Sequence, residues 1–441
     1  MPIELLLGDE AVALGALHAG IGGAFSYPGT PATEIFEFAA LRAADRDDVS
    51  ALWSANEKVA YEEALGMSYA GRRALVSMKH VGLNVAADPF MSSALTGVNG
   101  GMVLAVADDP GMHSSQNEQD SRYLAEFAQL PVIEPASQQE CYDMTIAAFD
   151  LSERVKLPVM VRLVTRLAHS RANVRVRENA ACESRRISER PDWRDWTLLP
   201  PNARRRYRRL LDLQKALREH AEHSPLNSLA LRGPRGILAG GLGFNYVRES
   251  LGDDHDYSLL RIGAYPIPAG LVRRLVDHCD EITIIEEGYP FIEDRLLGLL
   301  GVPGKTIRGK RSGDLPPSGE LTPDIVACAL GVERAHHAEA TEPVAARPPQ
   351  LCAGCPHADA FAAIVAATEQ YPNRALFGDI GCYTLGALPP YNGIHSCVDM
   401  GASIAMAHGA AQAGAHPVLA IIGDSTFAHS GMTALLDAVR V

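Results

Sequence analysis

The sequence predicts an α/β protein of three domains with mostly parallel sheets, the last domain being incomplete. Short apolar segments bounded by Gly and Pro alternate with segments of helical apolar spacing, first over residues 1–170, then after 231 and again after 350. Strands that alternate with amphipathic helices form parallel sheets covered by helices on both faces. At 441 residues the chain is long enough for each domain to have its own core.

The first domain is predicted from six strand-like segments. Residues 31–44 and 138–155 between them have the apolar spacing of helices. We expect this domain to close near Ser170. The strands are expected at 22–27, 49–53, 74–78, 102–108, 130–135 and 157–163, because these segments are apolar and flanked by chain breakers.

The rest of the chain divides by composition. Residues 171–230 are charged and rich in proline, which predicts a linker with one exposed helix over 204–223. Its basic cluster at 204–209 could bind an anion, but a solvated helix face explains it more simply. The remaining regions are a smaller α/β domain at 231–335 with strands at 235–241, 259–263 and 281–288, a linker at 336–349, and a third domain at 350–441.

The composition excludes several classes of protein. A net charge of −13 argues against general nucleic-acid binding, which needs a basic face. No apolar run approaches the ~18 residues of a membrane span. The start, MPIELLLGDEA, lacks the basic segment of a signal peptide. A cytoplasmic protein is therefore expected.

The eight cysteines form two groups. Four are widely spaced in apolar or mixed surroundings, and we expect buried thiols there. Four others gather in the last quarter, where Cys-x-x-Cys spacing in a cytoplasmic protein indicates metal or redox chemistry. From the residues alone, zinc and an iron–sulfur cluster fit equally well. The first group is Cys141, Cys182, Cys279 and Cys328, and the second is Cys352, Cys355, Cys382 and Cys397.

Ligands of an open parallel sheet bind beyond the carboxyl ends of its strands. After the strand at 22–27, Thr30 fits a helix N-cap and Pro31 the first helical position, which would present a hydroxyl and a helix N-terminus to an anion. An ordinary turn fits these residues equally well. Glu57 follows the strand at 49–53, where a carboxylate is either catalytic or simply favourable at a helix N-terminus.

Two more polar loops are expected at the same sheet edge. Lys79 and His80 follow the strand at 74–78, and a dense polar loop follows the strand at 102–108. A lone histidine is more often structural than catalytic, but two such loops at one edge favour a binding site. The second loop contains His113, Ser114, Ser115, Gln116 and Asn117.

The last quarter contains LCAGCPH, GDIGCYTLGALPP, HSCVDMGAS and IIGDST. Glycines at 378, 381 and 386 let the backbone approach a ligand closely. Asp424 follows an apolar strand and is a typical ligand of a hard cation, able to bridge Mg²⁺ to phosphates.

Seven segments together resemble one family. They are SYPGTPATEI, SANEKVAYEEALGMSYAG, MKHVGLNVAADPFM, DDPGMHSSQNEQDSR, LCAGCPH, GDIGCYTLGALPP and IIGDSTFAHSG. In this order they resemble the thiamine-diphosphate-dependent 2-oxoacid:ferredoxin oxidoreductases, and within them the large (alpha) subunits of the indolepyruvate ferredoxin oxidoreductases. The resemblance runs through all three α/β regions.

The resemblance implies a role for each domain. Residues 1–170 would hold the aminopyrimidine of thiamine diphosphate, 231–335 would be a transketolase C-terminal-like domain, and 350–441 would bind the diphosphate. Glu57 would hydrogen-bond N1′ of the aminopyrimidine, and Thr30 would lie beside the substrate carboxylate. The implied substrate pocket adds His80, His113, Ser114, Gln116 and Asn117, and the implied cofactor residues add Gly378, Asp379, Gly381, Gly401, Gly423, Asp424 as Mg²⁺ ligand, Ser425 and Thr426.

The resemblance also implies a [4Fe–4S] cluster. Cys352, Cys355 and Cys382 match three of its four ligands, and Cys397 is a candidate for the fourth. The family's second Mg²⁺ ligand, an Asn, and its ferredoxin-like tail lie beyond Val441, so a C-terminally truncated subunit is expected.

The implied reaction is the oxidative decarboxylation of an aryl 2-oxoacid with CoA, which gives an aryl-acetyl-CoA, CO₂ and two reduced ferredoxins. The implied partners are a beta subunit and ferredoxin, in a dimer of heterodimers. Three alternatives stay open: a non-redox thiamine-diphosphate decarboxylase or transferase, a zinc-stabilised binding module, and an inactive fragment.

Overall fold

The computed structural model describes residues 2–177, 192–252, 254–332 and 349–440. These residues fall into two compact units, one on each side of the boundary between His336 and His337. The predicted linker at 336–349 lies almost wholly outside the described residues, as does Cys182. Within the described residues, no helix combines the length and apolarity that a membrane crossing requires.

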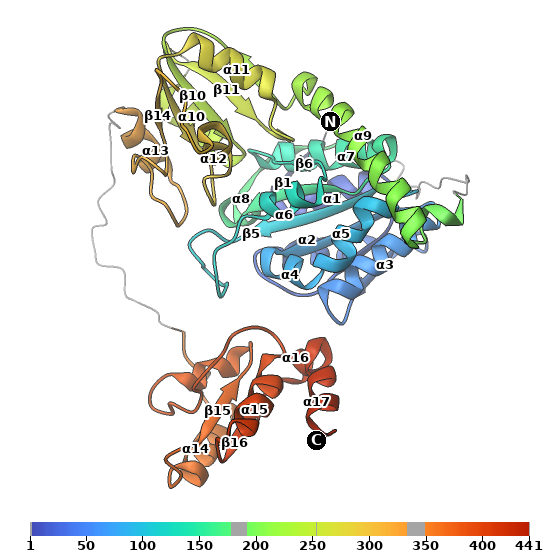
Figure 1. Cartoon of the computed structure of the whole chain (residues 1–441), viewed down its shortest axis with the longest axis vertical. Helices are drawn as coiled ribbons and strands as arrows, with labels where there is room; N and C mark the ends of the chain where they lie inside the picture. The colour runs from blue at the N-terminus through green and yellow to red at the C-terminus, as the bar shows by residue number, and fades with distance from the viewer. Residues whose placement is uncertain (1, 178–191, 253, 333–348, 441) are drawn as a thin grey trace. The chain divides into compact units, whose positions relative to one another are not determined.

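The first unit is built on a seven-stranded sheet (Figure 1). Six strands run parallel, and a short antiparallel strand lies at one edge. The order across the sheet is β12 (Ala264–Tyr265), β6 (Val132–Ile133), β7 (Val159–Val164), β5 (Met102–Asp108), β4 (Arg73–Lys79), β2 (Ile21–Ser26) and β3 (Ser50–Trp53).

The six strands predicted for this domain are all present, although the segment at 130–135 forms only the two-residue β6. Two strands at the ends of the domain, β1 (Ile3–Leu7) and β8 (Arg171–Arg175), pair antiparallel and were not predicted. The helices are α1 (Gly8–His18), α2 (Thr33–Ala43), α3 (Glu57–Tyr69), α4 (His80–Val85), α5 (Ala87–Thr96), α6 (Ser121–Ala128), α7 (Gln138–Val155) and α8 (Thr165–His169).

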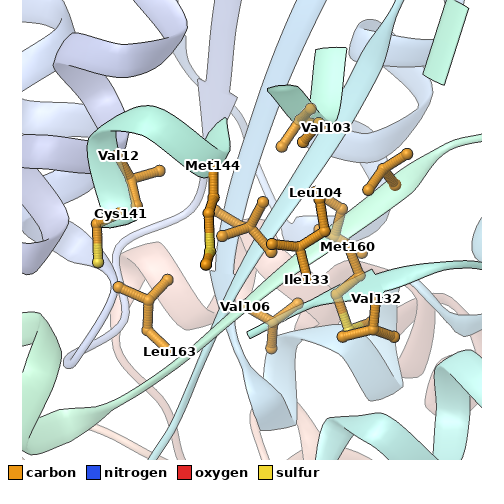
Figure 2. Packing of buried hydrophobic residues seen from close by; sticks show 14 of the residues in the cluster. Val12, Val103, Leu104, Val106, Val132, Ile133, Cys141, Met144, Met160 and Leu163 are labelled. Atoms are coloured by element: carbon orange, nitrogen blue, oxygen red, sulfur yellow. The ribbon is translucent and has the colours of Figure 1, made fainter. Parts of the chain in front are cut away.

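The core of this unit explains its apolar strands. Every residue of β4 and of β5 is buried, as expected for central parallel strands covered on both faces. Figure 2 shows side chains of this core, with Val12 of α1 beside Cys141 of α7 and with Met144 of α7 on the side of Leu104 and Val106 of β5. The predicted helix at 138–155 coincides with α7.

A second sheet in the same unit corresponds to the predicted domain at 231–335. Its strands are β14 (Thr306–Arg308), β13 (Glu281–Ile285), β10 (Arg235–Gly240), β11 (Ser258–Ile262) and β9 (Ser228–Ala230), in that order. β9 alone is antiparallel to its neighbour. The helices around this sheet are α10 (Leu242–Leu251), α11 (Ala269–His278), α12 (Phe291–Leu297) and α13 (Pro323–Leu330).

Buried ion pairs lie within the first sheet and between the two sheets. Arg162 of β7 binds Asp108 of the neighbouring β5 at 2.6 Å, and Arg122 of α6 binds Glu286, which follows β13 of the second sheet, at 3.0 Å. Arg122 also pairs with Asp120 at 2.5 Å. Because both guanidinium groups are fully buried, their carboxylate partners are needed to offset the cost of desolvation.

Helix α9 (Pro200–His223) corresponds to the helix predicted at 204–223 and follows the 3₁₀ helix η1 (Trp193–Asp195). The prediction of a fully exposed helix is wrong on one face, where Leu210, Leu217 and Ala221 are buried. Arg206 of the basic cluster is buried too. Its guanidinium donates to the carbonyls of Leu95 at 2.8 Å and Thr96 at 2.6 Å, which are at the end of α5.

The second unit has two paired parallel strands, β15 (Ala375–Gly378) and β16 (Val418–Ile421). Its core contains the buried side chains of Phe361, Tyr383 and Ile394. The helices are α14 (Pro356–Thr368), the 3₁₀ helix η2 (Cys382–Ala387), α15 (Ala402–Gln412), α16 (Asp424–Thr426), the π-helix η3 (Phe427–Gly431) and α17 (Met432–Ala438).

The thiols outside the second unit can be compared with the prediction of burial. Cys141 and Cys279 are buried as predicted. Cys328 is exposed, so that prediction is wrong. Helix α13 buries Val326 and Ala327 on one face and presents Cys328 on another.

Candidate functional site

The loop that carries Thr30 connects β2 to α2 at the carboxyl edge of the first sheet. Helix α2 begins at Thr33, whose hydroxyl oxygen accepts a hydrogen bond from the Gly29 amide at 2.9 Å. The predictions of Thr30 as N-cap and Pro31 as the first helical residue are therefore wrong. Thr30 is exposed, and its carbonyl accepts a hydrogen bond from Ser114 Oγ at 2.9 Å.

Glu57 is the first residue of α3 and is only 4% exposed. The helix is capped by Asn56, whose side chain accepts a hydrogen bond from the Val59 amide at 2.9 Å. The Glu57 side chain lies against Gly82 of α4, where an added Cβ would be 2.6 Å from Glu57 Cγ and 2.7 Å from Oε1. The segments that follow β3 and β4 therefore meet at this carboxylate.

His80 is buried at the start of α4, directly after β4. Its Nε2 lies 3.0 Å from the Asn117 carbonyl and must donate to it, because a carbonyl only accepts. In the neutral ring Nδ1 is then the acceptor nitrogen, and it is buried with no hydrogen-bond partner among the described residues. A buried acceptor without a partner fits a site that receives a ligand or water.

The other predicted pocket residues lie in different surroundings. His113 Nε2 is 3.2 Å from Glu320 Oε2, a carboxylate that follows the second sheet. Ser115 Oγ donates to Asp109 at 2.7 Å, and Gln116 is exposed. Ser114 and Asn117 are thus the members of this loop that contact the Thr30 and His80 segments.

Asp109 was not among the predicted site residues, and Lys79 was noted only as a polar residue after a strand, with no role in the pocket. Asp109 is fully buried at the end of β5 and accepts hydrogen bonds from the Ser114 amide at 2.9 Å and from the Thr165 hydroxyl at 2.8 Å. Burial raises its pKa, but these hydrogen bonds outweigh burial and leave the pKa below its ordinary value. Burial lowers the pKa of Lys79, against the opposing effect of Asp109 and Glu57.

Asp109 could have been identified from the sequence on the same ground as Lys79, because each stands at the carboxyl end of a predicted strand. Lys79 also approaches the Thr30 loop: a Cβ on Gly29 would be 3.0 Å from Lys79 Cδ. The first unit therefore brings together the loops that follow four parallel strands, with Glu57, Lys79 and His80 buried among them.

In the second unit, two aspartates follow the paired strands and have different roles. Asp379, after β15, is fully buried and accepts hydrogen bonds from the amides of Gly401 at 2.7 Å and Ser403 at 3.1 Å. It holds the turn into α15, where Gly401 has a φ of 92° that favours glycine. Asp424, after β16, is exposed and accepts a hydrogen bond from the Ser425 amide at 2.8 Å.

The surroundings of Asp424 suit a bound diphosphate and its cation. Ser425 is exposed beside it, whereas Thr426 is buried and donates to the Ile380 carbonyl at 3.0 Å, linking the two strand ends. A Cβ on Gly423 would be 2.9 Å from the Tyr383 ring. Exposed carboxylate and hydroxyl oxygens at a strand end are the ligand type that Mg²⁺ prefers.

Gly378 and Gly381 also permit close packing. A Cβ on Gly378 would lie 2.7 Å from the Ile394 side chain, and one on Gly381 would lie 2.4 Å from the Tyr383 ring. These two glycines therefore allow side-chain packing within the unit. Whether they also approach a cofactor stays a prediction.

Two of the predicted cluster thiols converge. Cys355 Sγ lies 3.4 Å and Cys382 Sγ lies 3.7 Å from the same atom, His357 Nδ1. Cys352 is exposed and forms a turn with Cys355, whose amide donates to the Cys352 carbonyl at 3.1 Å. In the described part of the chain, no three metal-ligating side chains that include a cysteine lie within 4.8 Å of one another, so a tetrahedral zinc cage is not preformed.

Cys397 lies in different surroundings. Its Sγ is 3.9 Å from the hydroxyl of Thr384, two residues beyond Cys382. Burial raises the pKa of the Cys397 thiol, which opposes formation of the thiolate that a metal ligand requires. The role of Cys397 as a fourth ligand stays a prediction.

The residues present fit thiamine diphosphate and Mg²⁺. In the first unit, the missing side chain of Gly82 lets the Glu57 carboxylate pack against the backbone of α4, and among the described residues His80 Nδ1 is buried without a hydrogen-bond partner. In the second unit, Asp424 offers an exposed hard-oxygen ligand at a strand end.

The chain is similar to known protein families in two regions and to known proteins over nearly its whole length. Residues 14–204 match the family "Pyruvate flavodoxin/ferredoxin oxidoreductase, thiamine diP-bdg", and residues 379–441 match "Thiamine pyrophosphate enzyme, C-terminal TPP binding domain". The indolepyruvate oxidoreductase subunit IorA of Archaeoglobus fulgidus is 40% identical over 455 residues, which cover 98% of this chain and 72% of that protein. The IorA subunit of Methanothermobacter thermautotrophicus is also 40% identical, over 99% of this chain and 72% of its own length.

A solved structure shows the same fold. The 2-oxoglutarate:ferredoxin oxidoreductase from Magnetococcus marinus aligns with a TM-score of 0.59 at 15% identity. The alignment covers 75% of this chain and 65% of that one.

Proposed function

The chain belongs to the family of indolepyruvate oxidoreductase IorA subunits, and on this premise we propose that it binds thiamine diphosphate and catalyses the oxidative decarboxylation of aryl 2-oxoacids. The products are an aryl-acetyl-CoA, CO₂ and reduced ferredoxin, with CoA and oxidised ferredoxin as co-substrates. Thiamine diphosphate supplies the carbanion chemistry, and the chain supplies binding, orientation and proton positions.

The observation that carries the proposal is the position of Glu57. A buried carboxylate lies at the carboxyl edge of a parallel sheet, against a glycine whose missing side chain lets the carboxylate occupy that position. Glu57 would hydrogen-bond N1′ of the aminopyrimidine and hold or release a proton there. A carboxyl group suits this role because it both donates and accepts a proton within an apolar cleft.

The substrate would be held by the loops around Thr30 and His80. His80 Nδ1, a buried acceptor, would receive a hydrogen bond from the substrate or from a water molecule. Lys79 would supply positive charge near the carboxylate of a 2-oxoacid, since it lies against Gly29 in the Thr30 loop. Together these groups would orient the acid and its leaving carboxylate.

In the second unit we propose that Asp424 ligates Mg²⁺ and that Ser425 lies beside the diphosphate. Asp379 would act indirectly by holding Gly401 and the start of α15. Cys352, Cys355 and Cys382 would bind a [4Fe–4S] cluster, with Cys397 as the candidate fourth ligand. The convergence of Cys355 and Cys382 on His357 supports this assignment.

The proposed partners are a beta subunit of the same oxidoreductase and ferredoxin, in a dimer of heterodimers. The IorA relatives are themselves named as subunits. We propose a cytoplasmic location because metal-binding thiolates persist in a reducing compartment.

The experiment is an assay of the chain co-purified with its partner subunit. Indolepyruvate should reduce ferredoxin in the presence of CoA, and Glu57→Gln should lower the rate at least a hundredfold with an unchanged unfolding temperature. The matched control is Glu62→Gln, because Glu62 lies on the same helix, is exposed and pairs with Lys58. A Glu57→Gln enzyme with the wild-type rate would remove this residue from the mechanism.

A further inference from the structure

A second candidate site lies where three helices of the first unit meet. Asp9 is in the first turn of α1, Glu34 is in the first turn of α2, and His169 is the last residue of α8. Each offers one ligand atom, and these atoms all lie within 4.8 Å of one another. His169 Nε2 is 3.2 Å from Glu34 Oε2.

Asp9 makes this group unusual. It is fully buried, and neither of its carboxylate oxygens has a hydrogen-bond partner among the described residues. The charges near it are unfavourable: burial raises the pKa of Asp9, and the carboxylates of Glu34 and Glu10 raise it further. An ionised carboxylate with acidic neighbours and no hydrogen bond is costly to bury, and a bound cation would stabilise it in the ionised form.

Glu10 does not account for the arrangement, because its own carboxylate is engaged elsewhere. Glu10 Oε2 accepts a hydrogen bond from the Leu7 amide at 2.8 Å, which caps α1. Asp9 therefore offers a third possible metal ligand beside Glu34 and His169, and its side chain does not cap its own helix.

We propose that Asp9, Glu34 and His169 bind a divalent transition-metal ion of the Mn²⁺ or Zn²⁺ type. One imidazole with two carboxylates suits such ions better than Ca²⁺ or Mg²⁺, which select oxygen ligands alone. Metal–ligand bonds of about 2.0–2.2 Å at tetrahedral angles place ligand atoms about 3.3–3.6 Å apart. The His169–Glu34 pair already has nearly this separation at 3.2 Å, and any pair near the 4.8 Å limit would close by about 1 Å or slightly more through side-chain rotation.

The site is open on one side. The side chains of Glu34 and His169 are 35% and 32% exposed, whereas Asp9 is buried beneath them. An ion can therefore enter from solvent and complete its coordination with water. Once bound, it would tie the first turns of α1 and α2 to the end of α8, and so fix the start of α2 beside the loop that carries Thr30.

The test uses the full chain, freed of metal with a chelator and titrated with Mn²⁺ in the absence of thiamine diphosphate. Mn²⁺ is the probe because the cysteines of the second unit, as soft ligands, discriminate against it. The loss of the free-ion EPR signal counts the bound ions. We expect wild type to bind one Mn²⁺ that Zn²⁺ displaces, and Asp9→Asn, Glu34→Gln and His169→Gln each to weaken that binding at least tenfold.

A matched control is Glu320→Gln. The His113–Glu320 pair has the same 3.2 Å separation but, among the described residues, lies in no group of three ligands within 4.8 Å. This variant should bind Mn²⁺ as wild type does. Loss of binding in Glu320→Gln to the same extent would place the ion elsewhere and overturn the proposal.

Thermal unfolding separates loss of the ion from loss of the fold. Mn²⁺ should raise the unfolding temperature of wild type and leave that of Asp9→Asn unchanged. Without metal, Asp9→Asn should unfold at the same temperature as wild type or higher, because it removes an unpartnered buried acid. Equal Mn²⁺ affinity in wild type and Asp9→Asn, or no binding by wild type, would refute the site.

Discussion

The carboxylate of Glu57 and the backbone of Gly82 are in direct contact, so that a methyl group at residue 82 would lie 2.7 Å from Glu57 Oε1. Because backbone atoms cannot move as freely as the end of a flexible side chain, we expect Gly82→Ala to displace the carboxylate. The variant should lose at least tenfold in affinity for thiamine diphosphate, measured by calorimetry.

Gly66 provides the control for this substitution. It lies within α3, and a Cβ there would meet nothing within 4 Å. Gly66→Ala should bind the cofactor as wild type does and gain about 0.5–1 kcal/mol in the free energy of unfolding, since alanine favours a helix. Wild-type cofactor affinity in Gly82→Ala would show that the contact does not position Glu57.

The two aspartates that follow the paired strands of the second unit should separate binding from stability. Asp424→Ala removes an exposed carboxylate and should weaken the Mg²⁺-dependent binding of cofactor with little change in the unfolding free energy. Asp379→Asn replaces an acceptor oxygen with a donor beside the buried amides of Gly401 or Ser403 and should cost about 1–3 kcal/mol of stability. Chemical denaturation and a Mg²⁺ titration of both variants would check this. Weaker cofactor binding in Asp379→Asn together with lower stability in Asp424→Ala would contradict both assignments.

Glu287 should make stability depend on pH. Burial raises the pKa of Glu287 from 4.5 to about 7, against the opposing effect of the Leu321 amide and Lys310. The folded state therefore holds this proton more tightly than the unfolded chain does. Its contribution to the free energy of unfolding is greatest below about pH 4.5 and is lost as the pH rises through about 7.

Glu287→Gln cannot lose a proton, and it still offers an oxygen to the Leu321 amide. Between about pH 5 and pH 8, wild type should lose about 1–3 kcal/mol relative to this variant, measured by denaturant unfolding. Glu219→Gln, an exposed change on α9, should show no such difference. A stability difference that stays constant with pH would show that Glu287 keeps its ordinary titration.

The cysteine assignment predicts a selective loss of iron. Cys355→Ser and Cys382→Ser should each remove most of the bound iron and most of the EPR signal of the reduced cluster. The reason is that a hydroxyl is a poor ligand for this cluster. Cys328→Ser is the control, since Cys328 is exposed but lies in the first unit. Retained iron in Cys355→Ser and Cys382→Ser would refute the proposed ligands.

The strands of the first sheet could be predicted because each buried parallel strand is an apolar run bounded by chain breakers. β1 and β8 were missed because their exposed residues, such as Ile3 and Leu5, carry no pattern that predicts pairing across more than 160 residues of sequence. Such pairing depends on whether the first and last segments of a domain lie side by side in the fold. The strand propensity of the residues does not predict this.

Part of the candidate site could also be predicted from the sequence. Glu57 and Asp424 follow strands, and strand ends determine where ligands bind in a parallel sheet. The error at Thr30 arose because two hydroxyls, three residues apart, could each close the turn. The buried pairs of Arg122 and Arg162 were not predicted, because each arginine appears in sequence as an ordinary surface residue until the two sheets meet.

The central claim is that decarboxylation by this chain is oxidative. The most direct measurement compares the amount of CO₂ released with the number of electrons transferred to ferredoxin. The chain and its partner subunit would receive carboxyl-labelled indolepyruvate, CoA and oxidised ferredoxin, and labelled CO₂, reduced ferredoxin and the organic product would be quantified together. The account predicts two reduced ferredoxins and one aryl-acetyl-CoA for each CO₂, with no sustained turnover when CoA is omitted. Release of CO₂ with an aryl-acetaldehyde as product and no reduced ferredoxin would contradict it.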